Sequence, residues 1–232
     1  MPKTQPTMIR PYSLFASVIM VLFAPLLAMS YFATKDGAEM LKMASVRAWA
    51  APARRLFEPM LSFASADRVY ATYSLLIALV IPALPLAAWA VRRARLPLAG
   101  TFERRASWLV AAAWSVFSAS LLVVAVALQI KPANSSGNSV VNVVFLAGMI
   151  PGLLIGCLGS APLGVSLLRH GFLPRIAGFI ITLALPLWVL STFLLGHNSI
   201  GLLPQMIAWT LALSASMKPT GSDAQMRSGI TN

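Results

Sequence analysis

The sequence predicts an all-α, polytopic integral membrane protein with about six transmembrane helices in one bundle. Two observations predict this fold class: 58% of the residues are hydrophobic, and six long stretches contain no Asp, Glu, Lys or Arg. An α-helix rises about 1.5 Å per residue, so ~20 apolar residues cross the hydrocarbon core of a bilayer. We expect the six spans at residues 12–33, 69–91, 107–130, 140–168, 176–195 and 200–217.

The first span follows a basic start with Lys3 and Arg10, as the apolar region of a secretory signal peptide would. Its apolar run continues through Tyr31, Phe32 and Ala33, which is longer than the usual signal-peptide core. We therefore expect an uncleaved first helix, preceded by a short N-terminal segment at residues 1–11.

Residues 34–68 form the longest connection, and their pattern is amphipathic. Residues 38–51 place Met40, Leu41, Ala44 and Ala48 on one side of a helix, which predicts an interfacial helix on the membrane surface that ends at Pro52. The charged side chains of this connection suggest contacts with lipid headgroups. The candidate lipid contacts are Arg47, Arg54, Arg55, Glu58 and Asp67.

Two connections resemble each other. Residues 85–97 (PLAAWAVRRARLP) and 162–174 (PLGVSLLRHGFLP) align without a gap at an offset of 77 residues. They indicate either parallel repeats of one helical hairpin, a construction known in transporters, or two tight turns with the same local requirements.

Small residues recur every four positions in the fourth span, where they form a continuous stripe on one helix face. Such a stripe lets another helix approach closely, inside the bundle or between subunits, although a glycine-rich helix bent by Pro151 and Pro162 could also line a pathway. Replacing a central glycine with Leu should disrupt this packing, while the same change at Gly221 should not. The predicted helix-packing stripe is Gly148, Gly152, Gly156, Ser160 and Gly164.

Polar residues are rare within the spans. Gln129, Asn142, His197 and Asn198 fall near predicted span ends, where water satisfies them. Gln205 and Thr210 could mark a site in the last span, but such residues are more typical of interhelical contacts.

The net charge of +12 indicates membrane topology rather than nucleic-acid binding, because Lys and Arg gather at span ends and no basic soluble module is present. With the N-terminus inside, the cytoplasmic segments hold eleven Lys and Arg residues and the opposite side holds seven. The positive-inside rule then predicts a cytoplasmic N-terminus and a flexible cytoplasmic tail at 218–232. The excess of Arg over Lys and the abundance of Ala are typical of a GC-rich bacterium, so we expect the inner membrane of a bacterial cell.

Catalytic and cofactor sites of usual composition are not expected. No span contains a carboxylate, Cys157 is the single cysteine, and His170 and His197 are predicted on opposite sides of the membrane. The sequence therefore predicts no metal, no cofactor and no enzymatic activity. It favours an interaction, accessory or lipid-binding protein, whose partners are membrane lipids and either a second copy or another membrane protein.

Two alternatives remain open. A small permease or lipid transporter without a carboxylate proton relay would use the hairpin repeat and the helices interrupted by Pro and Gly. A lipid-headgroup enzyme would use the carboxylates and arginines of the 34–68 loop.

Overall fold

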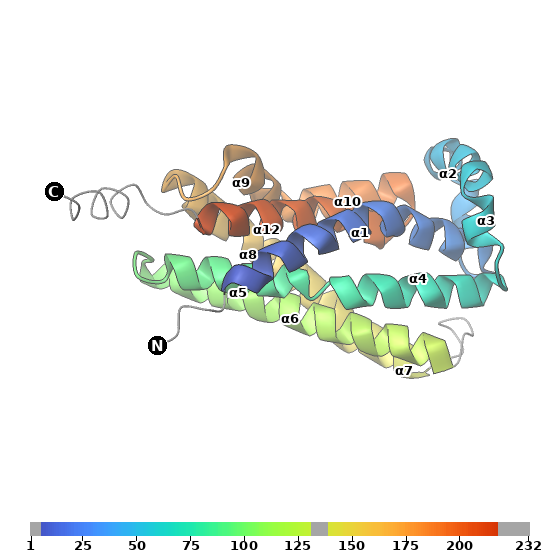
Figure 1. The fold of residues 1–232 in the computed structure, drawn as a ribbon, viewed down its shortest axis with the longest axis horizontal. Helices are drawn as coiled ribbons and strands as arrows, with labels where there is room; N and C mark the ends of the chain where they lie inside the picture. The colour runs from blue at the N-terminus through green and yellow to red at the C-terminus, as the bar shows by residue number, and fades with distance from the viewer. Residues whose placement is uncertain (1–5, 131–138, 218–232) are drawn as a thin grey trace.

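The computed structural model describes residues 6–130 and 139–217, and it confirms the predicted all-helical membrane bundle (Figure 1). Five helical segments are long and apolar enough to cross a membrane, and the count is six if the bent helix pair Arg175–Thr182 with Ala184–Leu195 forms one span. Large apolar side chains such as Leu22, Val123 and Leu158 face outward, as a lipid environment requires. The five segments are Met8–Ala33, Ala66–Arg95, Thr101–Ile130, Ser139–Arg169 and Asn198–Ser216.

The first span is the helix α1 (Pro6–Ala33), and it leads into three short helices at one end of the bundle, here called the α2 end (Figure 1). These are the 3₁₀ helix η1 (Ala38–Lys42), α2 (Ala44–Leu56) and α3 (Glu58–Leu61). The prediction that Pro52 ends the interfacial helix is wrong, because α2 continues through Pro52 to Leu56.

The predicted apolar face of this helix is also wrong. Ala44 and Ala48 are exposed, whereas Val46 and Ala50 are buried against Phe32 of α1. Val46 and Ala50 are four residues apart and therefore share one face. That face turns toward the bundle, where it packs against Ala28 and Phe32 of α1, and α2 also contacts α10. One face of α2 therefore packs on the bundle, while Ala44 and Ala48 are exposed.

The second span is α4 (Ala66–Val80) followed by α5 (Ala83–Arg95). The break has a local cause. Pro82 and Pro85 have no backbone N–H to donate, and in a continuous helix each ring would clash with the carbonyl four residues earlier. The third span, α6 (Thr101–Ile130), contains no proline and is continuous.

The fourth span changes its helical geometry in the middle. α7 (Ser139–Val144) passes into a π-helical turn, η3 (Phe145–Met149), and then into α8 (Ile150–Arg169). In this turn the N–H of Ile150 donates to the carbonyl of Phe145, five residues earlier. Pro151 follows directly and has no N–H to continue an ordinary α-helical pattern, which accounts for the position of the turn.

The fifth predicted span is not one straight helix. α9 (Arg175–Thr182) and α10 (Ala184–Leu195) meet at an angle of 73°. Pro186 lies in the first turn of α10, and a straight continuation would press its ring against the carbonyl of Thr182. The chain then forms α11 (Asn198–Gly201) and α12 (Leu203–Ser216).

The small-residue stripe of the fourth span faces α6 and α9. A Cβ atom at Gly152 would lie 2.8 Å from the backbone nitrogen of Phe117, and one at Gly156 would lie 3.0 Å from the ring of Trp114. A Cβ atom at Gly164 would lie 2.7 Å from the backbone nitrogen of Thr182. These contacts lie within one chain. Gly148 faces Ser120 in the same way, and Ser160 is buried with its hydroxyl donating to the carbonyl of Gly156.

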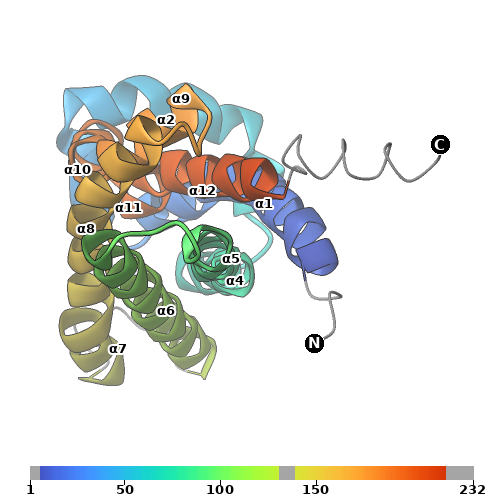
Figure 2. The same ribbon diagram turned by 90° about the vertical axis from the view of Figure 1, so that its left-hand side faces the viewer.

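A buried ion pair joins three spans at the opposite end of the bundle, here called the α9 end. This end faces the viewer in Figure 2. Nε of Arg95 donates to Oε1 of Glu103 at 2.7 Å, and the Ser166 hydroxyl donates to Oε2 at 2.9 Å. Both charged side chains are less than a tenth exposed. The guanidinium also lies 5.6 Å from the ring of Phe172, so α5, α6, α8 and the turn before α9 are held together.

The two similar connections both lie at the α9 end, one between α5 and α6 and the other between α8 and α9. The helices that follow them differ, because α6 is continuous while α9 bends into α10. The similarity between residues 85–97 and 162–174 is therefore limited to the two turns and does not extend over whole helical hairpins.

Candidate functional site

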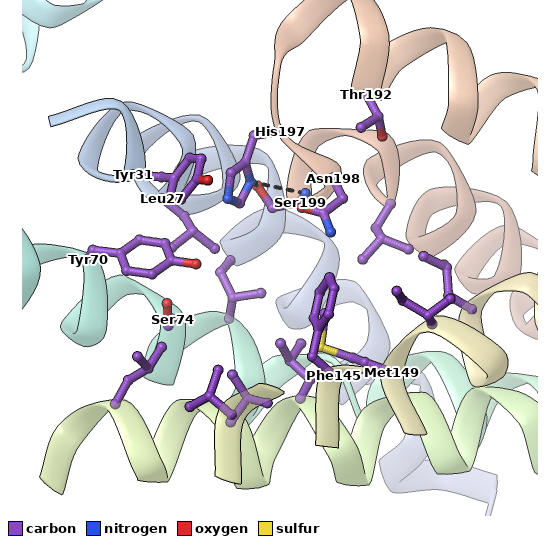
Figure 3. Close-up of a pocket in the computed structure, with 18 of the residues that line it drawn as sticks. Leu27, Tyr31, Tyr70, Ser74, Phe145, Met149, Thr192, His197, Asn198 and Ser199 are labelled. Carbon is purple, nitrogen blue, oxygen red and sulfur yellow. Dashed lines mark hydrogen bonds between the residues drawn. The ribbon is translucent and has the colours of Figure 1, made fainter. Parts of the chain in front are cut away.

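A cavity of about 650 Å³ lies between the spans toward the α2 end (Figure 3). Its walls come from α1, α4, α6, the α7–α8 segment, α10 and α11, so helices far apart in the chain enclose it together. This volume falls in the range of small-molecule pockets.

Away from the helix ends the cavity is lined mostly by apolar side chains, with Ser74 and Thr192 as polar exceptions. The π-helical turn contributes Phe145 and Met149, one at each end of η3, and both side chains line the space (Figure 3). π-Helical turns are frequent at functional sites, because they change the direction in which the neighbouring side chains point. The other apolar lining residues include Leu27, Ile77, Phe117, Leu121, Val124, Leu128, Leu153, Leu154, Trp188 and Leu202.

The rim of the cavity is polar and lies where the helices end. Three rings form a cluster there, which we call the aromatic trio: Tyr31 of α1, Tyr70 of α4 and His197 from the α10–α11 connection (Figure 3). Their ring centroids are 5.1 Å apart for Tyr31–His197, 5.4 Å for Tyr31–Tyr70 and 6.4 Å for Tyr70–His197. The remaining polar rim residues are Thr34, Asp36, Asp67, Asn142, Asn198 and Ser199.

His197 is 8% exposed and is fixed in orientation by Ser199. Its Nδ1 lies 2.7 Å from the Ser199 hydroxyl and accepts the Ser199 backbone N–H at 3.2 Å. Burial lowers the pKa of His197 to about 4, so the ring is neutral at physiological pH. In the tautomer in which Nδ1 accepts the Ser199 backbone N–H, the proton of the neutral ring is on Nε2.

His197 should make the stability of the protein depend on pH. Its pKa is ~6.5 when unfolded and about 4 when folded, so its contribution is complete above pH ~6.5 and is lost as the pH falls toward 4. We expect the wild type to lose about 2 kcal/mol more than His197→Asn between pH 7 and pH 5. The free energy of unfolding in detergent, measured at both pH values, checks this. Equal losses would contradict it, since Asn keeps the capping acceptor but does not titrate.

The structure divides the predicted lipid contacts between two places. Asp67 lies on the rim of the cavity, whereas the other four residues line a separate surface pocket of about 360 Å³ beside α2, which we call the α2 pocket. The apolar wall of that pocket includes Met29, Phe32 and Leu41. The four residues are Arg47, Arg54, Arg55 and Glu58, and all four are exposed.

The four carboxylates on which a headgroup enzyme would depend are not brought together. Asp36 and Asp67 line the cavity, Glu58 lines the α2 pocket, and Glu39 pairs with Lys42 at 2.6 Å on the surface. Across residues 6–130 and 139–217, no group of three or more His, Cys, Asp or Glu side chains could hold a metal ion.

Sequence reasoning missed the cavity, although it singled out some of its polar residues. The sequence analysis expected three polar residues to lie at span ends in contact with water, and instead they line the rim of the cavity: Asn142, His197 and Asn198. The available signal was the coincidence of Tyr31, Asp67 and His197 at three span ends on one predicted side of the membrane.

Other polar residues of the spans make interhelical contacts. Gln205 is fully buried and donates to the carbonyl of Ile180 at 3.0 Å, in the last turn of α9 where carbonyls lack helical partners. The Thr210 hydroxyl lies 2.9 Å from that of Ser17, and Gln129 donates to the carbonyl of Ala71 at 2.6 Å.

These features define a polytopic helical membrane protein with an internal cavity that is apolar inside and polar at its rim. Comparison with protein-family models, with curated proteins and with solved structures finds no significant match to this chain.

Proposed function

We propose that this protein is a non-enzymatic, lipid-binding membrane protein that holds an amphiphilic molecule in the cavity at the α2 end. The apolar tail of the ligand lies among residues such as Leu121 and Val124, and its polar head lies at the rim. The observation that supports the proposal most directly is the distribution of lining residues, because an apolar interior with a polar rim matches an amphiphile along its length.

The first experiment is native mass spectrometry of the protein released from a gentle detergent. We expect a stoichiometric lipid to be retained by the wild type. Replacing both Leu121 and Val124 with Trp fills the cavity from one face of α6, and we expect retention to fall about tenfold, the change expected when about 1.4 kcal/mol of contact is lost.

The matched control replaces Leu122 and Val123 with Trp. These neighbours are 37% and 46% exposed and face away from the cavity, so the added volume should leave retention unchanged. Equal retention by both double variants, or a wild type without bound lipid, would contradict the proposal.

A lipid transporter is the second candidate, and it is favoured by the irregular helices around the cavity. The π-helical turn and the bend between α9 and α10 are places where a span can change shape with little loss of hydrogen bonding. Transport requires that the cavity also open toward the α9 end. Single cysteines at Val110 and Leu163, which are buried between the cavity and that end, would be placed in a background with Cys157→Ala. They would become reactive to aqueous thiol reagents during transport and would stay protected in a lipid-binding protein.

We further propose that both termini face the cytoplasm of a bacterial cell and that the α2 pocket contacts lipid headgroups on the outer side. The excess of Lys and Arg at the opposite end supports this orientation. Proteolysis of the C-terminal tail in inside-out vesicles, but not in right-side-out ones, tests it.

A further inference from the structure

The rim of the cavity has negative charge without a described positive partner. Asp36 and Asp67 line the cavity, and none of the described lining residues is Lys or Arg. In the part of the chain that the structure describes, acidic side chains form ion pairs only at Glu39 and Glu103. Asp36 and Asp67 are partly buried, so their charges are screened less than those of exposed carboxylates.

The arginine next to Asp67 does not neutralise the rim. Arg68 is exposed and its Nη1 donates to the backbone carbonyl of Gln129 at 3.2 Å, which directs the guanidinium to the end of α6. A ligand with a carboxylate or sulfate head would therefore meet like charge at the rim, whereas a cation would be attracted.

The aromatic trio adds a second attraction for a cation. Aromatic faces carry negative charge density and bind ammonium groups, most strongly where water is excluded. Tyr31 and Tyr70 both line the cavity, and their rings are tilted by 48° to each other. Asp67 lies one helical turn before Tyr70 in α4, and Asp36 lies five residues after Tyr31, so the carboxylates and the rings belong to the same end of the cavity.

His197 adds a hydrogen-bond donor beside them. In the tautomer in which Nδ1 accepts the Ser199 backbone N–H, the Nε2–H of His197 has no acceptor among the described residues, while its ring lines the cavity. An oxygen close to the ligand head, such as a hydroxyl or ester oxygen, would accept this hydrogen bond.

We infer that the cavity selects an amphiphile whose head carries an ammonium group, with the head between the rim carboxylates and the aromatic trio and the tail in the apolar interior. This inference rests on the proposed function. The α2 pocket has the opposite character, since three arginines and one glutamate line it, and it is suited to an anionic headgroup instead.

The test compares three probes with the same apolar chain: dodecylamine, dodecanol and dodecanoate. Each is added to the full-length protein in a maltoside detergent, and its retention is measured by native mass spectrometry. We expect the wild type to retain dodecylamine at least about tenfold better than the other two, and Asp36→Asn with Asp67→Asn to remove that preference without changing dodecanol retention.

A matched control removes two carboxylates outside the cavity, by Glu39→Gln and Glu58→Gln, and should keep the preference. Equal retention of the three probes, a preference for dodecanoate, or an unchanged preference in the Asp36/Asp67 variant would overturn the inference while leaving amphiphile binding intact. Retention of no probe by the wild type would overturn the proposed function as well.

Discussion

Replacing Glu103 with Ala is expected to destabilise the protein by about 3–5 kcal/mol, because the buried Arg95 guanidinium loses its counter-charge. Glu103 accepts hydrogen bonds from both Arg95 and Ser166, and its side chain is 5% exposed. Arg95 is itself only 7% exposed, so its unpaired charge would be left largely out of contact with water. The free energy of unfolding in mixed detergent micelles measures the effect.

Two controls separate the loss of a partner from the loss of charge itself. Replacing Arg95 and Glu103 together with Met removes both charges, and the double variant should recover most of the lost stability. Replacing Glu39 with Ala breaks the exposed pair with Lys42 and should change stability by less than about 1 kcal/mol. If Glu103→Ala were no more destabilising than Glu39→Ala, the ion pair would not hold the α9 end together.

Replacing Gly152 with Leu is expected to cost about 3 kcal/mol by forcing α8 away from α6. The first added carbon would lie 2.8 Å from the nitrogen of Phe117 and 3.0 Å from the carbonyl oxygen of Ala113. Both are backbone atoms of α6, so neither can move without moving the helix. Even Gly152→Ala should therefore destabilise, although by less than Leu.

The glycine series provides its own controls. Gly156 faces the ring of Trp114, which can shift more easily than backbone, so Gly156→Ala should cost less than Gly152→Ala. A Cβ atom at Gly100 would have no neighbouring atom within 4 Å, and Gly100→Ala should be close to neutral. Gly221 was the control suggested by the sequence, but it lies outside the described residues. Equal unfolding free energies across the series would refute close packing of α6 and α8.

The sequence by itself was enough to predict that the protein lies in a lipid bilayer. It was also enough to predict the number of apolar segments and the positions of most span ends. These follow from local composition, because apolar length and charge-free runs act within a single helix. It also marked the stripe from Gly148 to Gly164, since a four-residue repeat places small side chains on one face whatever the partner is.

Only the tertiary structure decided which faces meet. Val46 rather than Ala44 is buried because α1 and α10 lie on that side of α2, and Glu103 is buried because Arg95 and Ser166 converge on it from other spans. The cavity is likewise formed by residues far apart in the chain, such as Tyr31, Tyr70 and His197, whose closeness depends on how several helices pack. No local pattern specifies such distances, since packing free energy depends on all the contacting helices together.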